Sequence, residues 1–574
     1  MADTDIGSPD PATTFAAEPG DVAAGPAAGR APGAGFRRRR RGWLIVAVPA
    51  AVSLVLGGYQ IGGPSLWRDE AYTKDAIARP FGQIFVLLGH QDAVHGAYYL
   101  LMHVVAAVLG TSATALRFPS LCAMVIATGF VAATGRRAAA LALAPAAADG
   151  APDTADGAPD TGRNGRGLDV PALTGLFSGL LFATAPYMTY YAQMARSYAI
   201  ETMFAVIASY LLLRAWPDGR WRWWLGYAAA VALTGLFNVF GLLILVAHGV
   251  TLLLTDARGQ TAPGRRAGRI PLRWLAACGA ALIVLGPLLG LASRQQVQIA
   301  WLNRPTLNAM ERLLTNLAGS RPLIVPFALL ALGGLLAAWL ADHWRPLNPA
   351  AIALPWLVVP PLVLVTVSFV KPVYYVRYVE FCLPALAILA GAGLTALVRL
   401  AAITPLRRWR LGPLRLAWLP AVLAVAVLAA LLAGPQQAIR QTAARPDNLR
   451  LASAIVAAHE QPGDVVFYIP ATMHVLGTGY PAPFGRLRDI ALNQSAIASG
   501  TLTGTEITSP ARLKSRFTAS SAERVWVVTG ASNYRFPVLS TPMDKEKMAL
   551  VAGAGLHIVH RWQAGEVMLT LYGP

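Results

Sequence analysis

Long apolar runs recur along most of this chain, and they limit its fold more than any other feature. A run of about 18 or more apolar residues with few charges is a candidate membrane-spanning helix. Only 13% of the 574 residues are charged and 55% are hydrophobic, and the mean hydropathy is +0.49. Soluble domains carry roughly 25% charged residues. We therefore predict an all-α polytopic membrane protein and exclude a soluble globular one.

About eleven runs are long and apolar enough to be predicted as transmembrane helices. The predicted spans are Trp43–Ile61, Ala115–Ala133, Pro171–Tyr190, Tyr198–Ala215, Trp223–Phe237, Val239–Leu254, Trp274–Ala292, Leu323–Ala341, Ile352–Val370, Arg377–Val398 and Leu414–Ala433. One further apolar segment, Gly96–Leu109, is shorter than the roughly 20 residues that a span needs. We expect it to be an interfacial or re-entrant helix, which makes residues 63–114 one long outer loop.

The formal net charge of +19 is explained by membrane topology. Lys and Arg concentrate in the cytoplasmic loops of membrane proteins and set their orientation. The run Arg37–Arg41 precedes the first span, and the pair Arg136-Arg137 follows the second. This pattern predicts a multi-pass protein of the plasma (inner) membrane with a cytoplasmic N-terminus. It gives no reason to expect a nucleic-acid partner.

Three regions are predicted. Residues 1–36 are rich in Ala, Gly, Pro and Asp, so we expect a disordered cytoplasmic N-terminus. Residues 37–434 form the transmembrane domain. Residues 435–574 are predicted to be a small extracytoplasmic α/β domain, with an amphipathic helix at Leu449–His459 and short strands rich in Val, Ile and aromatic residues. The predicted strands are Asp464–Ile469, Arg524–Thr529, His557–Trp562 and Val567–Leu571.

Charged and hydrogen-bonding side chains gather in the predicted outer loops, close to the apolar boundary. Asp69 and Glu70 alone have two interpretations, an interfacial ion pair with Arg68 or Lys74, or part of a site. Arg377 alone has the ordinary role of a helix-end anchor. Polar residues at membrane depth usually line a cavity or a substrate path, and carboxylates with arginines suit a phosphate-bearing substrate. The candidate residues are Asp69, Glu70, Asp92, His95, Arg196, Tyr198, Lys371, Arg377 and Tyr378.

Several short segments stand out together, in a fixed order along residues 43–398. They are Trp67-Arg68-Asp69-Glu70-Ala71, His95-Gly96-Ala97-Tyr98-Tyr99-Leu100-Leu101-Met102-His103, Ala115-Leu116-Arg117-Phe118-Pro119-Ser120, Ala195-Arg196-Ser197-Tyr198-Ala199 and Arg377-Tyr378. In this order they resemble motifs of the GT-C membrane glycosyltransferases. The closer resemblance is to the branch of glycosyltransferase family 39, the protein O-mannosyltransferases and the lipid A aminoarabinose transferases. Gly96 departs from that branch, which commonly has proline at this position.

The resemblance implies a hexosyl- or pentosyltransferase that uses a polyprenyl-phosphate sugar and inverts the anomeric configuration. It implies Asp69 as the general base on an acceptor hydroxyl, with Glu70 supporting it; which of these two carboxylates takes the proton stays open. The acceptor would be a lipid, a glycan or a protein. The donor phosphate would be held by Arg196, Lys371, Arg377 and Tyr378, and the sugar or acceptor would be oriented by Asp92, His95 and Tyr198.

The second outer turn lacks an obvious Asp-x-Asp, so the chain resembles the metal-dependent oligosaccharyltransferase branch less closely. We predict no metal site and no other cofactor; a bound divalent metal remains an alternative without support. Two other functions stay open. A transporter or flippase of a lipid-linked sugar would also need polar residues at membrane depth, but inverted repeats are not visible. A membrane-anchored cell-envelope assembly protein would act through residues 435–574.

Overall fold

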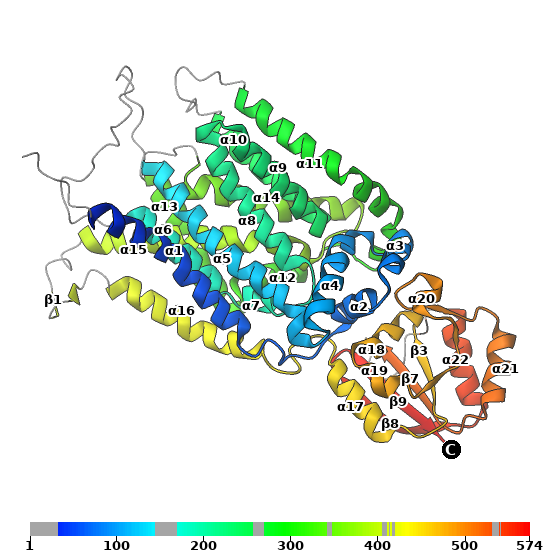
Figure 1. Cartoon of the computed structure of the whole chain (residues 1–574). Helices are drawn as coiled ribbons and strands as arrows, with labels where there is room; N and C mark the ends of the chain where they lie inside the picture. The colour runs from blue at the N-terminus through cyan, green and yellow to red at the C-terminus, as the bar shows by residue number, and fades with distance from the viewer. Residues whose placement is uncertain are drawn as a thin grey trace, which may run out of the picture. The chain divides into compact units, whose positions relative to one another are not determined.

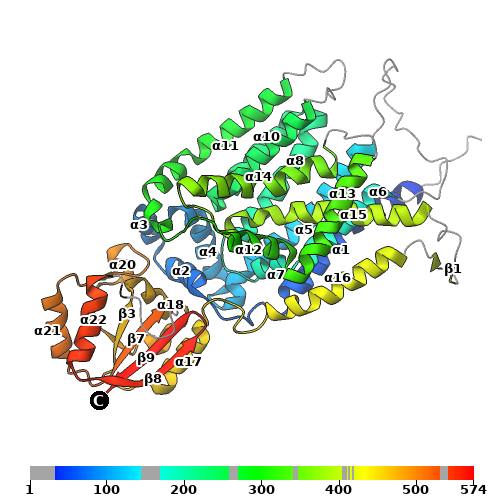
Figure 2. The ribbon, with the colours of Figure 1, turned by 180° about the vertical axis from the view of Figure 1, so that it is seen from behind.

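The computed structural model describes residues 33–143, 169–256, 269–340, 347–403, 410–411, 414–415, 419–530, 539 and 541–574. The predicted disordered N-terminus lies almost wholly outside these residues. Residues 43–574 form one compact unit with a helical part and a C-terminal sheet domain (Figures 1 and 2).

The helical part contains long helices and several single-turn elements. Its α-helices are α1 (Gly33–Gly58), α2 (Arg68–Ile77), α3 (Phe81–His90), α4 (Gly96–Leu109), α5 (Ala113–Leu143), α6 (Val170–Thr184), α7 (Pro186–Ala192), α8 (Tyr198–Asp218), α9 (Trp221–Phe237), α10 (Leu243–Asp256), α11 (Arg269–Arg294), α12 (Leu307–Ala318), α13 (Ile324–Leu340), α14 (Pro349–Val370), α15 (Leu383–Ile403) and α16 (Leu419–Ala438). Its 3₁₀ helices are η1 (Ala93–His95), η2 (Val239–Leu242), η3 (Gln296–Ile299), η4 (Arg321–Leu323) and η5 (Val376–Cys382).

Within the described residues, six helices are long and apolar enough to cross a membrane. They are α5, α8, α11, α13 with η4, α14, and η5 with α15. The pair α6 and α7, bent by 63°, makes a seventh if it counts as one span. The prediction of a mostly helical multi-span membrane protein is confirmed. The other four predicted spans overlap α1, α9, α10 and α16, whose apolar parts are shorter, so the count of eleven stays a prediction. The predicted start of the last span at Leu414 is wrong, because Leu414–Arg415 forms strand β2 and α16 begins at Leu419.

Close backbone contact joins the spanning helices where glycine removes the side chain. A Cβ atom at Gly393 of α15 would collide with the carbonyl oxygen of Leu330 in α13. On the facing helix, a Cβ atom at Gly334 would collide with the carbonyl oxygen of Leu389. Lipid offers no hydrophobic drive for helix association, so such close packing through small residues supplies the contact energy.

Helix α4 covers Gly96–Leu109, the bounds predicted for the short segment, and its 14 residues are too few for a span. Tyr98, Tyr99 and Met102 form its buried face, while Val104 and Val108 are exposed. Together with α2 and α3, it occupies the region predicted as one long loop between the first two spans (Figure 1).

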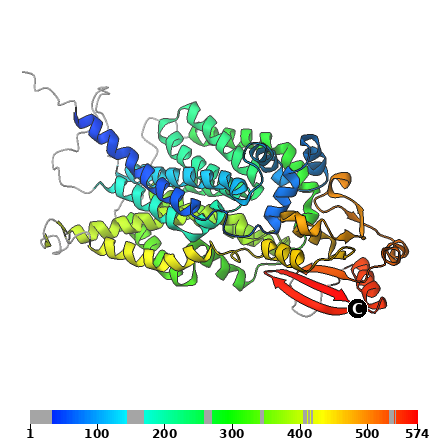
Figure 3. The ribbon, with the colours of Figure 1, turned by 60° about the horizontal axis from the view of Figure 1, so that its bottom comes forward.

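The C-terminal domain is built on a five-stranded mixed sheet in the order β4-β3-β7-β9-β8. Strands β4, β3 and β7 are parallel, whereas β9 runs antiparallel to β7 and β8, and β8 and β9 form the long red hairpin in Figure 3. The four predicted strands are confirmed as β3 (Val465–Ile469), β7 (Val525–Gly530), β8 (His557–Ala564) and β9 (Val567–Gly573). The elements that the sequence analysis missed are β4 (Arg488–Asp489), β5 (Leu492–Gln494), β6 (Thr505–Glu506), α18 (His474–Gly479), α19 (Pro481–Phe484), α20 (Ala496–Ser499), α21 (Pro510–Ser520) and α22 (Pro542–Gly553).

Both faces of this sheet are covered, which explains why β3 is apolar throughout. Val466 and Tyr468 face a core closed by α17 (Leu449–His459) and α18, whereas Val465 and Phe467 face a core closed by α21 and α22. Neighbouring strand residues point to opposite faces, so a sheet covered on both sides needs an unbroken apolar run. Ala71 of α2 belongs to the first of these cores, so the domain packs directly on α2.

Candidate active site

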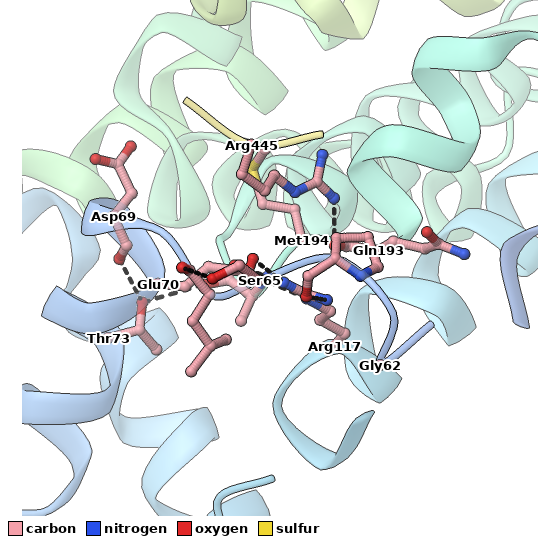
Figure 4. A network of polar contacts seen from close by, with 12 residues as sticks. Gly62, Ser65, Asp69, Glu70, Thr73, Arg117, Gln193, Met194 and Arg445 are labelled. Atoms are coloured by element: carbon pink, nitrogen blue, oxygen red, sulfur yellow. Dashed lines mark hydrogen bonds and ion pairs between the residues drawn. The ribbon is translucent and has the colours of Figure 1, made fainter. Parts of the chain in front are cut away.

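Asp69 and Glu70 occupy the first turn of α2, and their side chains point in different directions and contact different residues. Adjacent residues of an α-helix point about 100° apart. Figure 4 shows the Asp69 carboxylate pointing away from the Glu70–Arg117 pair. The Asp69 side chain is 15% exposed, whereas that of Glu70 is fully buried. One carboxylate of the pair is therefore accessible and the other is sealed.

Glu70 forms a bidentate ion pair with Arg117 of α5. The Arg117 Nε and Nη2 atoms lie 2.8 Å from the two carboxylate oxygens. The three remaining N–H groups of this guanidinium are directed at the carbonyl oxygens of Ile61, Pro64 and Ser65, so all five donors are used. Burial would raise the pKa of Glu70, but the Arg117 charge outweighs it and lowers that pKa. The pair fixes the chain between α1 and α2.

The same carboxylate also accepts a hydrogen bond of 2.8 Å from the backbone N–H of Ala195. This bond fixes the turn before α8, in which Arg196 follows directly. Arg445, which precedes the C-terminal domain, is buried nearby and donates to the carbonyl oxygen of Gln193 at 2.6 Å (Figure 4). Glu70 therefore holds α2, α5 and the turn with Arg196 in one arrangement.

Asp69 forms an ion pair with Arg377 of η5. The Arg377 guanidinium also lies 4.5 Å from the centre of the Tyr375 ring and 5.6 Å from that of Trp67. Burial would raise the pKa of Asp69, but the charges of Arg377 and Arg196 outweigh it and lower that pKa below its ordinary value. Asp69 is therefore ionised at neutral pH.

Arg196 lies in the turn between α7 and α8 and connects Asp69 to His95. Its Nη1 atom is 3.4 Å from the Asp69 carbonyl oxygen, and its Nη2 atom is 2.5 Å from His95 Nε2. Because Arg196 can only donate, His95 Nε2 must accept, which places the imidazole proton on Nδ1. Burial, followed by the Arg196 charge, lowers the pKa of His95 to about 4. His95 is therefore neutral, although Asp92 lies 3.8 Å away.

Asp92 completes this group at the turn before η1. Its backbone is in the left-handed region, with φ of 61°, and the Tyr99 hydroxyl donates a hydrogen bond to its carboxylate. Tyr99 in turn lies 3.5 Å from Arg196. Contacts therefore link Arg377, Asp69, Arg196, His95 and Asp92 continuously.

A cavity of about 1010 Å³, including its open mouth, lies beside this group. Four of the predicted site residues line it, namely His95, Tyr198, Lys371 and Tyr378. The Lys371 ammonium donates to the side-chain oxygen of Gln296, and the Tyr378 ring stacks on Phe240 with 4.5 Å between ring centres. Asp69, Arg196 and Arg377 are not among the lining residues, but Arg196 reaches the cavity through its contact with His95.

Two arginines of this linked group have a hydrogen-bond donor that is not used. The Nε atoms of Arg196 and Arg377 are buried and have no hydrogen-bond partner among the described residues. A buried donor without a partner is costly, so these atoms are suited to an oxygen-rich ligand that would complete their bonding.

Two further positions belong to the candidate site and are not among the residues predicted for it. Arg117 stands inside an otherwise apolar span, where an arginine signals a buried partner. Asn238 lies between two predicted spans, lines the cavity and donates to Glu201 at 2.7 Å. The signal for Asn238 was a single polar residue between two apolar runs.

Among the described residues, we find no group of three or more His, Cys, Asp or Glu side chains that could hold a metal ion.

Three comparisons relate this chain to known proteins. Residues 170–290 match the family model described as dolichyl-phosphate-mannose-protein mannosyltransferase. A comparison with curated sequences finds no match.

Among solved structures, the chain resembles ArnT from Cupriavidus metallidurans in the apo state, with 14% identity, coverage of 93% of this chain and 98% of that chain, and a TM-score of 0.54. It also resembles ArnT of the same organism bound to undecaprenyl phosphate, with 15% identity, coverage of 92% and 98%, and a TM-score of 0.53. The predicted resemblance is confirmed, since this chain has a fold similar to that of ArnT and its residues 170–290 match the dolichyl-phosphate-mannose-protein mannosyltransferase model.

Proposed function

We propose that this chain is a glycosyltransferase that moves a sugar from a polyprenyl-phosphate donor to an acceptor hydroxyl on the extracytoplasmic face of the membrane. The observation that carries the proposal is the ionised carboxylate of Asp69 set among Arg377, Arg196 and a cavity lined by His95 and Lys371. The family match at residues 170–290 and the ArnT-like fold support the same reaction class.

Asp69 is the general base in this proposal. Its carboxylate takes the proton of the acceptor hydroxyl, and the hydroxyl oxygen attacks the anomeric carbon from the face opposite the phosphate. The bond between the anomeric carbon and the phosphate oxygen breaks, and polyprenyl phosphate leaves with the electron pair. The sugar configuration inverts, and the proton ends on Asp69.

The donor phosphate is held by Arg196, Arg377, Lys371 and Tyr378. The unused Nε–H groups of both arginines are available to phosphate oxygens. A phosphate at Arg377 would share the cation that now lowers the pKa of Asp69. As negative charge develops on the leaving phosphate, Arg377 is drawn toward it, which increases the basicity of Asp69 as the proton is transferred.

The other candidate residues support this centre. Glu70 fixes α2 and the turn with Arg196 through its contacts with Arg117 and the Ala195 amide, so we assign it a positioning role. His95, Asp92 and Tyr198 orient the sugar or the acceptor, with His95 and Tyr198 at the cavity wall.

The orientation deduced from the arginine clusters completes the proposal, with a cytoplasmic N-terminus and the site and C-terminal domain outside. The donor partner is a polyprenyl-phosphate sugar, and ArnT in complex with undecaprenyl phosphate has the same fold. The acceptor is a lipid, glycan or protein hydroxyl.

The test is a transfer assay with purified protein and a panel of radiolabelled polyprenyl-phosphate hexoses and pentoses, each with lipid, glycan and peptide acceptors. The wild type is expected to transfer sugar from at least one donor or to hydrolyse it slowly, and Asp69→Ala is expected to do neither. A wild type that releases no sugar from any donor would count against a glycosyltransferase.

A further inference from the structure

The N-terminus of α2 has no capping side chain of its own. Trp67 stands at the cap position, and an indole ring cannot accept a hydrogen bond from the free amides of the first turn. A carboxylate from far along the chain takes this place. The Oδ2 atom of Asp447 accepts a 3.1 Å hydrogen bond from the backbone N–H of Arg68, the residue directly before Asp69.

Asp447 is held by two bonds on this side. Its other oxygen, Oδ1, lies 3.1 Å from the Arg68 guanidinium, and its side chain is only 2% exposed. The carboxylate therefore fixes both the backbone and the side chain of one residue. A negative charge at a helix N-terminus is also favoured by the helix dipole.

Asp447 is in turn tied to the sheet of the C-terminal domain. It forms a β-bridge with Gly565, the first of the two residues between β8 and β9. Two backbone hydrogen bonds flank this bridge. The backbone N–H of Asn448 donates to the carbonyl oxygen of Ala564, and the backbone N–H of Glu566 donates to that of Pro446. Gly565 has a φ of 65°, and a Cβ atom there would collide with the carbonyl oxygen of Pro446. The turn between β8 and β9 therefore requires glycine at this position to pack against residues 446–448.

Further contacts from the same domain reach α2 and the segment directly before it. The Lys74 ammonium donates to the Gly479 carbonyl oxygen at 2.8 Å, and the Leu66 amide donates to the Tyr480 hydroxyl at 3.1 Å. Ala71 is fully buried in the core of the domain. The helix therefore lies between the sheet domain on one side and Arg117 and Arg377 on the other.

We propose that the C-terminal domain is required for the geometry of the active site and that its contact residue Asp447 is a positioning residue for Asp69. This inference rests on the proposed function, in which Asp69 is the base. The cap sets where the first turn of α2 begins, and a misplacement of about 1 Å at a reacting group can cost about 100-fold in rate. The domain thereby positions Asp69 through α2, although none of the cavity-lining residues comes from this domain.

The test compares Asp447→Ala and Asp447→Asn with the wild type in the transfer assay, measuring kcat and the donor KM separately and repeating kcat over a pH range. Asparagine keeps an oxygen that can accept from the Arg68 amide, whereas alanine does not. Glu460→Gln is the matched control, because Glu460 pairs with Arg486 within the C-terminal domain.

We expect Asp447→Ala to lower kcat by about 10–100-fold with little change in the donor KM, because the phosphate-binding side chains lie outside α2. The acid limb of its pH profile of kcat should move to higher pH, because a displaced Asp69 would lie farther from the Arg377 charge that stabilises its ionised form. Asp447→Asn should recover most of the rate, and Glu460→Gln should match the wild type. Lys74→Ala provides a second, milder variant should Asp447→Ala fail to fold; it should also lower kcat with little change in the donor KM.

Suppose that the wild type is active and Asp69→Asn is inactive, but Asp447→Ala keeps the kcat and the pH profile of the wild type. This result would overturn the inference and leave the proposed function standing. A loss in Asp447→Ala that asparagine does not recover would also overturn it, as would an unchanged kcat in Lys74→Ala where Asp447→Ala does not fold. A wild type without transfer from any donor would overturn both.

Discussion

The carboxylate of Asp69 and the guanidinium of Arg377 form an ion pair across 308 residues of sequence. The pair joins α2 to η5, which begins the candidate span that continues as α15. Its cation pairs directly with the carboxylate of the base and also has a buried Nε–H without a partner among the described residues, available to a phosphate. This shared arginine couples departure of the leaving group to proton transfer in the proposed reaction.

Replacing Arg377 by alanine should raise the pKa of Asp69. The folded-state pKa lies below the ordinary value of 3.8, so the basic form is present above that pH and is lost as the pH falls through the folded pKa. Without the Arg377 charge, burial raises the pKa of Asp69, so the acid limb of the pH profile of kcat should move to higher pH. Arg377→Lys, which keeps the charge, should move it less. An acid limb at the wild-type position in Arg377→Ala would contradict the assignment.

Breaking the buried Glu70–Arg117 pair should destabilise the protein strongly. Glu70→Gln leaves the fully buried Arg117 cation without its counter-charge, which costs about 3–5 kcal/mol. The pKa of Glu70 is lowered by Arg117, so the stabilisation is present above its ordinary value of 4.5 and is lost as the pH falls through the folded pKa. Thermal unfolding in detergent at several pH values measures both effects.

A matched control exists on the surface. Glu311 pairs with Arg321 at 2.6 Å, but their side chains are 46% and 74% exposed. Glu311→Gln should therefore change thermal stability little. Equal losses in Glu70→Gln and Glu311→Gln would argue against the structural role of the buried pair.

His95 should remain neutral through the working pH range. Its pKa is lowered to about 4, so the neutral form adds stability above the ordinary value of 6.5, and this stability is lost as the pH falls from 6.5 toward 4. His95→Gln keeps an acceptor for Arg196 and should retain most turnover. His95→Ala leaves a buried donor unpaired, at a cost of about 1–3 kcal/mol, and should lose more. A kinetic limb near pH 6.5 that disappears in His95→Gln would contradict this.

Lys371→Ala should weaken donor binding with less effect on turnover. Lys371 lines the cavity but is exposed, so the expected rise in donor KM is about 2–10-fold. Arg294, an exposed cation at the end of α11, does not line the cavity, and Arg294→Ala should leave KM unchanged. Steady-state kinetics with one donor over a range of concentrations compares the two. Equal effects would indicate general electrostatic attraction in place of a phosphate contact.

The sequence predicts local structure well where one physical rule governs it. The length of the apolar run predicts helix α4 with its observed bounds, and enrichment in Val and Ile predicts β3 and β7. It does not predict contacts between distant segments, such as the capping of α2 by Asp447. Short helices with mixed composition, such as α21, were missed because tertiary packing, more than local pattern, stabilises them.

The candidate site shows the same division. The outer loops and span ends predicted four of the residues that line the cavity, because polar side chains beside apolar spans are unusual; they are His95, Tyr198, Lys371 and Tyr378. The adjacent carboxylates looked equivalent in the sequence. Their different roles come from helix geometry and from Arg117, which lies 47 residues beyond Glu70 and uses every donor it has.

The central claim is that Asp69 is the general base, and the most direct measurement is the single-turnover rate of sugar transfer by Asp69→Asn on a donor that the wild type uses. Asparagine is nearly isosteric but cannot take the proton. The account predicts a rate lower by about 10²–10⁴-fold with donor binding retained. A rate equal to that of the wild type would contradict it.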